Sequence, residues 1–246
     1  MNRSPLLACA AALALSLTAV AAYAQAALTG DHIPTNKGEL VIHPANHAGM
    51  VLSWGGKTIY VDPVGANYYQ GLPAPDLILI TDIHGDHMDP ATLNALAGVA
   101  PIVAPQAVRD MLPPALQARV QVLANGASAT VVTVPVTAVP MYNTTAERLK
   151  FHSKGRGDGY VLTLGGKRVY IAGDTEPTPE MLALKNIDVA FLPMNLPYTM
   201  TEEQAAEAVK TFKPKIVYPY HYRGSDPAKF AALVGPAAEV RLRNWY

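Results

Sequence analysis

Two segments of this chain repeat one pattern, and the repeat restricts the folds that the chain can adopt. Residues 50–63 read MVLSWGGKTIYVDP and residues 160–175 read YVLTLGGKRVYIAGDT, so both place Gly-Gly-Lys between β-rich flanks. A Gly-Gly pair in that setting predicts a β-hairpin with a two-residue turn. Both segments then have a β-branched residue, Tyr and a second β-branched residue, and both reach an aspartate, Asp62 or Asp174. The repeat favours a fold with two similar β-rich halves, although two unrelated hairpins of similar chemistry would also produce it.

The rest of the chain alternates between strand and helix patterns. Residues 77–81 are a continuous apolar run, which predicts a buried strand. Asp89 and Pro90 predict the start of a helix that Gly98 ends. The other expected elements are strands at 101–104, 129–139, 188–194 and 215–220, a helix near 178–184, and a helix that opens with a capping box at Thr201 and Gln204 and stops at Pro214. This mixture indicates layered α/β architecture, and we expect residues 27–246 to form one domain.

The first 26 residues are typical of an export signal. Arg3 gives a positive start, residues 6–20 are apolar and rich in Ala and Leu, and the small residues of AAYAQA allow cleavage after Ala24 or Ala26. A membrane span is the alternative, but the apolar run is short for one, since a span needs about 20 apolar residues. We therefore expect a signal peptide and an exported protein, periplasmic or secreted, with no membrane span after removal of the signal.

Composition narrows the partners and the chemistry of the mature chain. Lys plus Arg and Asp plus Glu both total 19, so the formal net charge is zero and a nucleic acid is not the expected partner. A small-molecule substrate is expected instead. The only cysteine, Cys9, lies within the export signal, so the mature chain has no thiolate ligand or nucleophile. Histidines and carboxylates must therefore hold any metal ion.

The segment TDIHGDH at residues 81–87 carries the ligands for such an ion. Side chains alternate along an extended segment, so Asp82, His84 and Asp86 share one face, and His87 follows where the chain turns towards the next helix. The segment comes directly after the buried strand at 77–81, where α/β sheets tend to place their sites. A solvated polar loop is the alternative, but four metal-ligand types within six residues favour a metal site.

This motif resembles the Thr-His-x-His-x-Asp-His signature of the metallo-β-lactamase superfamily, with aspartate in place of the first histidine. Three further segments agree in the expected order. NHAGMVLSWGGKTIYVDP is similar to the opening hairpin of the branch related to ascorbate-6-phosphate lactonase, YIAGDT to the segment of the bridging aspartate, and VYPYHY to the segment of the last histidine. The resemblance covers residues 39–223 and implies an αββα sandwich with two similar halves and with metal ions in the cleft between the sheet edges.

Carried over residue by residue, the resemblance implies one complete metal site. Its ligands are Asp86, His87 and His221, and Asp174 bridges this metal to a second one. All four positions have the residue type that the superfamily uses there.

The other metal site departs from the superfamily pattern. It normally takes three histidines, but here His84 fills one place and Asp82 stands where another histidine is expected. The third histidine is missing, because the equivalent position falls near Tyr142 and Asn143. His152 lies nine residues after Asn143 and could swing in, but it does not match the motif.

An aspartate at position 82 changes the expected charge and metal preference of the centre. Two divalent ions with Asp86, Asp174 and a bound hydroxide carry a net charge of plus one, and Asp82 makes the centre neutral. Neutrality raises the pKa of bound water relative to a three-histidine site, and the harder ligand favours manganese or iron over zinc there. We expect zinc as the divalent metal, in one or two ions, with manganese or iron as alternatives. If the altered site holds no ion, Asp82 orients a histidine instead.

The ligand set predicts a hydrolase in which a metal-bound hydroxide attacks an ester, lactone, amide or phosphodiester. Asp86 and Asp174 are the candidate catalytic residues, because both can orient the hydroxide while they serve as ligands. Two alternatives remain open: an iron-dependent oxidoreductase on the same fold, and a metal-binding module without catalytic activity.

Residues outside the ligand set are candidates to bind substrate. His47 matches a histidine common at the start of this branch's hairpin, although a histidine hydrogen-bonded at a strand edge fits equally well. Tyr142 and Asn143 can donate hydrogen bonds to substrate, and a structural role in a turn is their alternative. Tyr198 and Tyr222 are further candidates to line the pocket.

Overall fold

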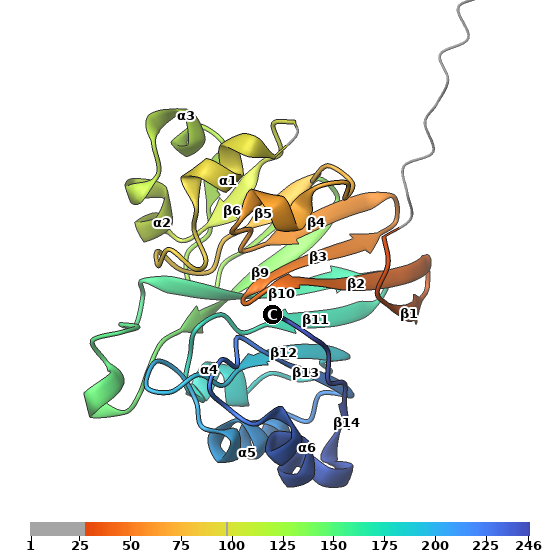
Figure 1. Ribbon diagram of the computed structural model, residues 1–246, viewed down its shortest axis with the longest axis vertical. Coiled ribbons are helices and arrows are strands. Elements are labelled where there is room, and N and C mark those ends of the chain that lie inside the picture. Colours follow the sequence, from red (N-terminus) through yellow and green to blue (C-terminus); the bar gives the residue numbers. More distant parts are fainter. Residues whose placement is uncertain (1–27, 97) are drawn as a thin grey trace, which may run out of the picture.

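The computed structural model describes residues 28–246 except residue 97, so the expected signal peptide lies outside the described residues. Two seven-stranded sheets stack face to face, and helices cover the outer face of each (Figure 1). The first sheet contains β1 (Asp31–Thr35), β2 (Gly38–Asn46), β3 (Gly49–Trp54), β4 (Lys57–Val61), β5 (Leu77–Leu79), β6 (Ile102–Ala104) and β7 (Val120–Val122). The second contains β8 (Ser128–Val131), β9 (Val134–Met141), β10 (Gly157–Leu164), β11 (Lys167–Ile171), β12 (Val189–Pro193), β13 (Ile216–Tyr220) and β14 (Glu239–Val240).

The two sheets have the same plan, which confirms the two similar halves predicted from the repeat. Strands follow the chain order in each sheet. Pairing is antiparallel from β1 to β4 and parallel from β4 to β7, and it is likewise antiparallel from β8 to β11 and parallel from β11 to β14. The predicted αββα sandwich is therefore the observed fold.

Helices form the outer layers (Figure 1). The first sheet carries α1 (Pro90–Ala95), α2 (Gln106–Met111) and α3 (Pro114–Gln117), and the second carries α4 (Pro179–Leu182), α5 (Glu202–Phe212) and α6 (Pro227–Val234). Short 3-10 turns lie at Ala66–Tyr69, Ala146–Arg148 and Gly235–Ala237. Every helix in the described part of the chain falls short of the length and apolarity that a bilayer crossing requires.

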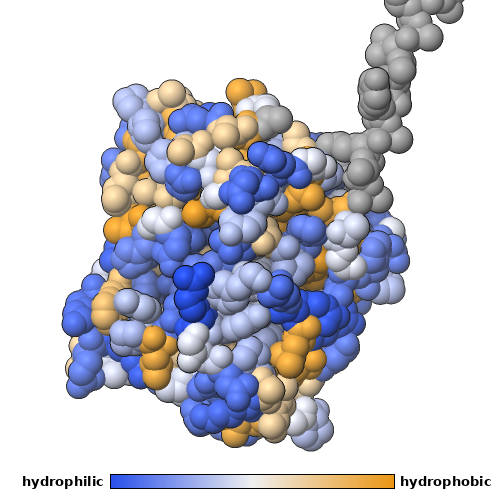
Figure 2. All heavy atoms as spheres, in the orientation of Figure 1, coloured by the Kyte–Doolittle hydropathy of each residue, from blue (hydrophilic) through white to orange (hydrophobic). Residues whose placement is uncertain are grey.

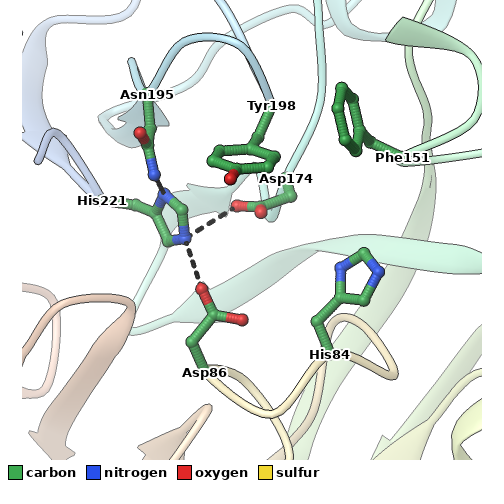
Figure 3. A pocket seen from close by; sticks show the side chains of 7 residues that line it. All are labelled: His84, Asp86, Phe151, Asp174, Asn195, Tyr198 and His221. Carbon is green, nitrogen blue, oxygen red and sulfur yellow. Dashed lines mark hydrogen bonds and ion pairs between the residues drawn. The ribbon is translucent and has the colours of Figure 1, made fainter. Parts of the chain in front are cut away.

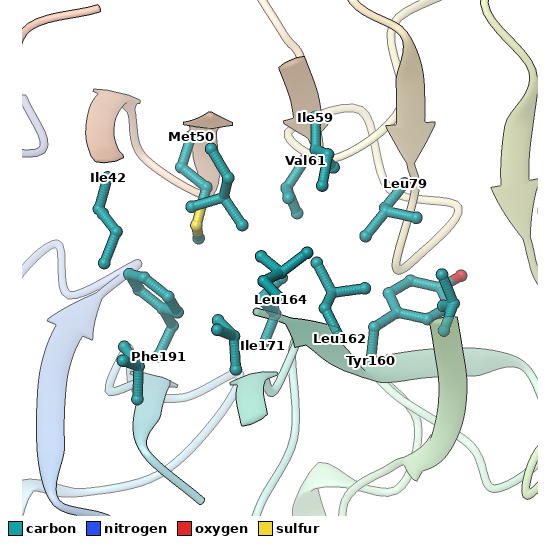
Figure 4. Packing of buried hydrophobic residues seen from close by; sticks show 14 of the residues in the cluster. Ile42, Met50, Ile59, Val61, Leu79, Tyr160, Leu162, Leu164, Ile171 and Phe191 are labelled. Atoms are coloured by element: carbon teal, nitrogen blue, oxygen red, sulfur yellow. The ribbon is translucent and has the colours of Figure 1, made fainter. Parts of the chain in front are cut away.

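The main core lies between the sheets, where the inward side chains of both hairpins meet (Figure 4). Each sheet also has one hydrophobic cluster between its outer face and the helices that cover it. The outer surface is mixed: hydrophilic side chains predominate across the middle of the face in Figure 2, and hydrophobic ones are scattered. Because both sheets are covered on both sides, the parallel strands read as apolar runs in the sequence.

Local signals explain most of the element boundaries. Both Gly-Gly pairs have positive φ, between 55° and 82°, as a two-residue hairpin turn between twisted strands requires. The Asp89 side chain accepts hydrogen bonds from the backbone of Ala91 and Thr92 and so starts α1, which ends at Ala95, before Gly98. The capping box at Thr201 is confirmed.

One expected strand is wrong. Residues 129–139 do not form a single strand, because Val132 and Thr133 have φ of 42° and 72° and turn the chain between β8 and β9. Val131 pairs with Val134 across this turn. A pair of β-branched residues gives no sign of a turn that needs positive φ, so the sequence pattern did not reveal it.

Candidate metal centre

The candidate ligands lie where strands of both sheets end. The segment that follows β5 carries Asp82, His84, Asp86 and His87, and the segments after β11 and β13 carry Asp174 and His221. These are carboxyl ends of parallel strands, which meet at one edge of each sheet. Stacking of the two sheets brings the two edges together, so both halves contribute side chains to one cluster.

The first group comprises His87, Asp174 and His221, whose ligand atoms lie within 4.8 Å of one another. Asp174 Oδ2 is 3.3 Å from His87 Nε2, and Asp174 Oδ1 is 3.4 Å from His221 Nε2. Asp86 joins the group, since its Oδ2 is 3.3 Å from His221 Nε2 (Figure 3). The structure thus brings together the four residues of the site that the resemblance implied to be complete.

Asp62, at the end of the first hairpin, orients His87 from behind. Its Oδ2 lies 2.8 Å from His87 Nδ1, and both side chains are fully buried. The same carboxylate accepts hydrogen bonds from the backbone and the hydroxyl of Thr81 at 2.7 and 2.6 Å. A carboxylate at Nδ1 makes that nitrogen the donor and leaves the lone pair of Nε2 directed at Asp174.

The second group comprises Asp82, His84 and His152, again within 4.8 Å. Asp82 Oδ2 is 2.7 Å from His84 Nδ1 and 3.7 Å from His152 Nε2. His152 Nε2 is also 3.3 Å from Asp174 Oδ2, so Asp174 lies between the two groups. His152, from the segment between β9 and β10, could swing in according to the sequence, and it lies beside Asp82 and His84, where a third ligand of this group would stand.

Asn143 and Tyr198 hold His152 in this position. The backbone N–H of Asn143 donates to the carbonyl of His152 at 2.9 Å, and His152 Nδ1 lies 3.2 Å from the carbonyl oxygen of Tyr198. A carbonyl oxygen accepts only, and this contact favours the tautomer of His152 with its proton on Nδ1. Its Nε2 therefore presents a lone pair to the carboxylates of Asp82 and Asp174.

Three buried atoms of the cluster have no hydrogen-bond partner among the described residues: His87 Nε2, His152 Nε2 and Asp174 Oδ1. Bare imidazole nitrogens beside a carboxylate oxygen repel one another unless a cation lies between them. Nitrogen and carboxylate donors in this number suit zinc and similar divalent ions. The residues present therefore fit a metal centre.

The opposite charges in the cluster favour the ionised carboxylate of Asp174 and the protonated imidazole of His87 over their neutral forms. Burial alone would raise the pKa of Asp174, but His221 and His87 hold it well below its usual range. Burial likewise would lower the pKa of His87, yet Asp174 and Asp62 raise it well above its usual value.

A cavity of about 300 Å³ opens onto this cluster. Phe151 and Tyr198 form one wall, with ring centroids 4.9 Å apart in an edge-to-face contact. Figure 3 shows these rings across the cavity from Asp86 and His84. The residues that line it are His84, Asp86, Phe151, Asp174, Asn195, Tyr198 and His221.

The candidate substrate-binding residues lie in different places. His47 is beside the centre: its Nε2 is 3.1 Å from Asp86 Oδ2, its Nδ1 is 2.8 Å from the Tyr246 hydroxyl, and its ring lies tilted by 36° against that of His221, with centroids 3.8 Å apart. Tyr142 and Asn143 do not line the cavity. The Tyr142 hydroxyl donates to Glu180 at 2.9 Å.

Asn143 supports the wall from behind, because its amide donates to the Tyr198 carbonyl at 2.7 Å. Contact of Tyr142 and Asn143 with substrate is therefore not supported by their positions. Tyr222 packs on Tyr246, with ring centroids 5.2 Å apart, and Tyr198 lines the cavity.

Known proteins are similar to this chain in sequence and in fold. A model of the beta-lactamase superfamily domain matches residues 42–221. A UPF0173 metal-dependent hydrolase of Pyrococcus abyssi is 32% identical over 209 residues, which are 79% of this chain and 92% of that protein. A crystal structure from Parabacteroides distasonis, of a protein described as a metal-dependent hydrolase, has a TM-score of 0.81 and 43% identity, and the match covers 87% of this chain and 98% of that chain. Igni18, a metallo hydrolase of Ignicoccus hospitalis, has a TM-score of 0.71 and 25% identity over 83% of this chain and 95% of that chain.

The sandwich of two similar halves, the ligand cluster at the sheet edges and these similarities define a protein of the metallo-β-lactamase superfamily. Within that superfamily, the chain belongs to the UPF0173 family of metal-dependent hydrolases.

Proposed function

We propose that this protein is a hydrolase with two divalent metal ions, one held by Asp86, His87 and His221 and the other by Asp82, His84 and His152, with Asp174 between them. The observation that carries the proposal is the pair of bare, buried nitrogens, His87 Nε2 and His152 Nε2, on either side of Asp174 Oδ2 at 3.3 Å each. While both histidines are neutral, neither nitrogen has a hydrogen-bond donor within reach in the described part of the chain, whereas each can be the ligand of a metal ion.

Zinc suits the group of His87, His221, Asp86 and Asp174, and the additional carboxylate of Asp82 lets manganese or iron compete at the other group. A divalent ion in this position supplies two things: it lowers the pKa of a water molecule, and it polarises a carbonyl group.

The side chains of the protein then orient the reactants. Asp86 remains ionised, because hydrogen bonds with His221 and His47 keep its pKa far below its usual value despite the opposing effect of burial. So weak a base accepts a hydrogen bond from the attacking water rather than storing its proton. Asp86 is also half-exposed to the cavity, which places it where a water molecule and a substrate meet.

The wall of the cavity favours an uncharged substrate with an apolar group. Phe151 and Tyr198 give an aromatic surface opposite the ligands, and Asn195 adds an uncharged polar side chain to the lining. Neither lysine nor arginine is among the described residues that line the cavity, although phosphate groups are commonly bound by such cations. We therefore propose an ester, lactone or amide in preference to a phosphodiester.

The same proposal includes export. The first 26 residues support a cleaved signal peptide, so the enzyme acts on small molecules in the periplasm or outside the cell. Cell fractionation with sequencing of the mature N-terminus tests this part: an intact N-terminus in the cytoplasmic fraction would refute it.

Metal analysis and one substitution test the catalytic part. Protein purified without added metal should contain two equivalents of zinc or manganese and should hydrolyse members of a panel of esters, lactones and amides. Asp86→Ala should abolish that hydrolysis, and Asp110→Ala, on α2, is the matched control. Predominant iron with oxygen consumption would establish the oxidoreductase alternative instead, and unchanged hydrolysis by Asp86→Ala would refute the proposed role of the site.

A further inference from the structure

Arg156 contacts the residue at which this chain departs from the superfamily motif. Its Nε and Nη2 donate to the two carboxylate oxygens of Asp82 at 3.3 and 3.2 Å. The Asp82 side chain is fully buried and that of Arg156 is 20% exposed. This paired geometry fixes both the charge balance and the orientation of the carboxylate.

The ion pair of Asp82 and Arg156 has a net charge of zero, as a neutral histidine does. Replacing a histidine ligand by aspartate adds one negative charge to a buried centre, and a guanidinium at hydrogen-bond distance cancels it. Asp82 alone was expected to make the two-metal centre neutral. With Arg156 beside it, the centre keeps the positive charge of a three-histidine site.

Arg156 also connects the two segments that form the second group. Its Nη2 donates to the carbonyl of Phe151 as well as to Asp82. Phe151 directly precedes His152, so one guanidinium holds the segment after β5 against the segment before β10. Asp82 Oδ2 consequently faces His84 Nδ1 at 2.7 Å and His152 Nε2 at 3.7 Å.

We propose that Asp82 and Arg156 together replace one neutral histidine of the metal centre, with Asp82 Oδ2 as the ligand atom and Arg156 as the positioning residue. The inference rests on the proposed function of the cluster as a metal centre. It differs from a purely structural ion pair because it requires the two residues to be coupled through the bound cation.

The test is a double-mutant cycle with Co²⁺ as the probe. Metal-free wild type, Asp82→His, Arg156→Gln and the double variant are titrated with Co²⁺, and stoichiometry and visible absorption are measured. Asp82→His alone leaves Arg156 as an uncompensated cation beside the metal, so the second Co²⁺ should bind at least about tenfold more weakly. The double variant is neutral again, and the affinity should return to within about threefold of wild type.

Further variants keep the test decisive. Asp82→Asn with and without Arg156→Gln repeats the cycle with a side chain of the same size, in case histidine does not fit at this buried position, and the second substitution should raise affinity above that of Asp82→Asn alone. Arg109→Gln, on α2, controls for the loss of one arginine.

Two outcomes would overturn the inference. Additive effects of the two substitutions would show an ordinary structural ion pair. A rise from one to two bound Co²⁺ in Arg156→Gln would show that Arg156 takes the place of the metal in the native protein. If wild type binds no Co²⁺ at all, the proposed metal centre itself fails, and this result is distinct from both of the others.

Discussion

Asp62 Oδ2 lies 2.8 Å from His87 Nδ1, and both side chains are completely buried. Asp62 ends the first hairpin as Asp174 ends the second, so the repeat in the sequence provides two aspartates with different tasks. Asp62 lies behind His87 and fixes its tautomer, whereas Asp174 faces its Nε2 at 3.3 Å. The orientation of His87, a candidate metal ligand, is thus set by a carboxylate that is not among the residues lining the cavity.

Replacing Asp62 by asparagine should weaken metal binding without unfolding the protein. Asp62 has φ of 43°, a conformation that asparagine tolerates well. The substitution replaces the charged carboxylate beside His87 Nδ1 by a neutral amide, which should lower metal affinity about 10- to 100-fold. Competition with a chromophoric chelator measures the affinity. Asp76→Asn is the control, because Asp76 is a partly exposed aspartate directly before β5. Equal metal affinity in the two variants would contradict the role of Asp62.

Removal of His152 should cost the protein one of the two metal ions that we propose. His152→Ala deletes a nitrogen that shares the second group with Asp82 and His84, while the group around His87 keeps its ligands. Metal analysis after dialysis should therefore find one equivalent in place of two. His32→Ala, at a half-exposed histidine on β1, should retain both. Two equivalents in His152→Ala would show that this histidine is not a ligand.

The aromatic wall should determine substrate preference. Phe151→Ala opens the face that Phe151 and Tyr198 form together, so esters with a bulky apolar acyl group should lose affinity. We expect KM for a phenylacetyl ester to rise about tenfold, since burial of such a group is worth roughly 1.5–3 kcal/mol, while KM for an acetyl ester changes little. Steady-state kinetics with the two esters give the comparison. An equal change for both would argue against a specific contact with the apolar group.

Asp158 should make the stability of the fold depend on pH. Burial raises its pKa to about 7, and its Oδ2 has no hydrogen-bond partner among the described residues. The native protein therefore holds a proton that the unfolded chain releases near pH 4, so unfolding free energy falls as pH rises from about 4 to about 7 and levels off above it. Asp158→Asn removes this dependence, and its stability relative to wild type should rise by roughly 2 to 4 kcal/mol over that interval. Urea denaturation at pH 4, 6 and 8 measures the difference, and parallel curves for the two proteins would contradict the assignment.

The sequence predicted the features that depend on local chemistry. Gly-Gly pairs, the cap at Asp89 and the capping box at Thr201 act within a few residues, and each is found where it was expected. The ligands after β5, β11 and β13 follow the same logic, because a strand end fixes their place. Their meeting point required the stacking of two sheets, which the resemblance supplied and local pattern did not.

His152 shows why the sequence left the remaining part of the site open. Its segment has no hydrophobic period, and its position depends on contacts with distant residues. The buried carboxylate of Glu176 accepts hydrogen bonds from the backbone of Thr144 and Thr145 at 2.7 and 2.6 Å. Arg148, in the same segment, donates to Glu176 and to the carbonyl of Thr199. A histidine placed by such long-range bonds cannot be located from its spacing to the motif.

Each metal group takes residues from both halves of the sandwich: His87 with Asp174 and His221, and Asp82 and His84 with His152. A bound cation is therefore a cross-link between two sheets that are far apart along the chain. The halves cannot separate while the cation keeps its ligands, so the unfolding rate should follow metal occupancy more closely than substitution of any single core residue. We therefore expect loss of the proposed metal to make separation of the two halves faster.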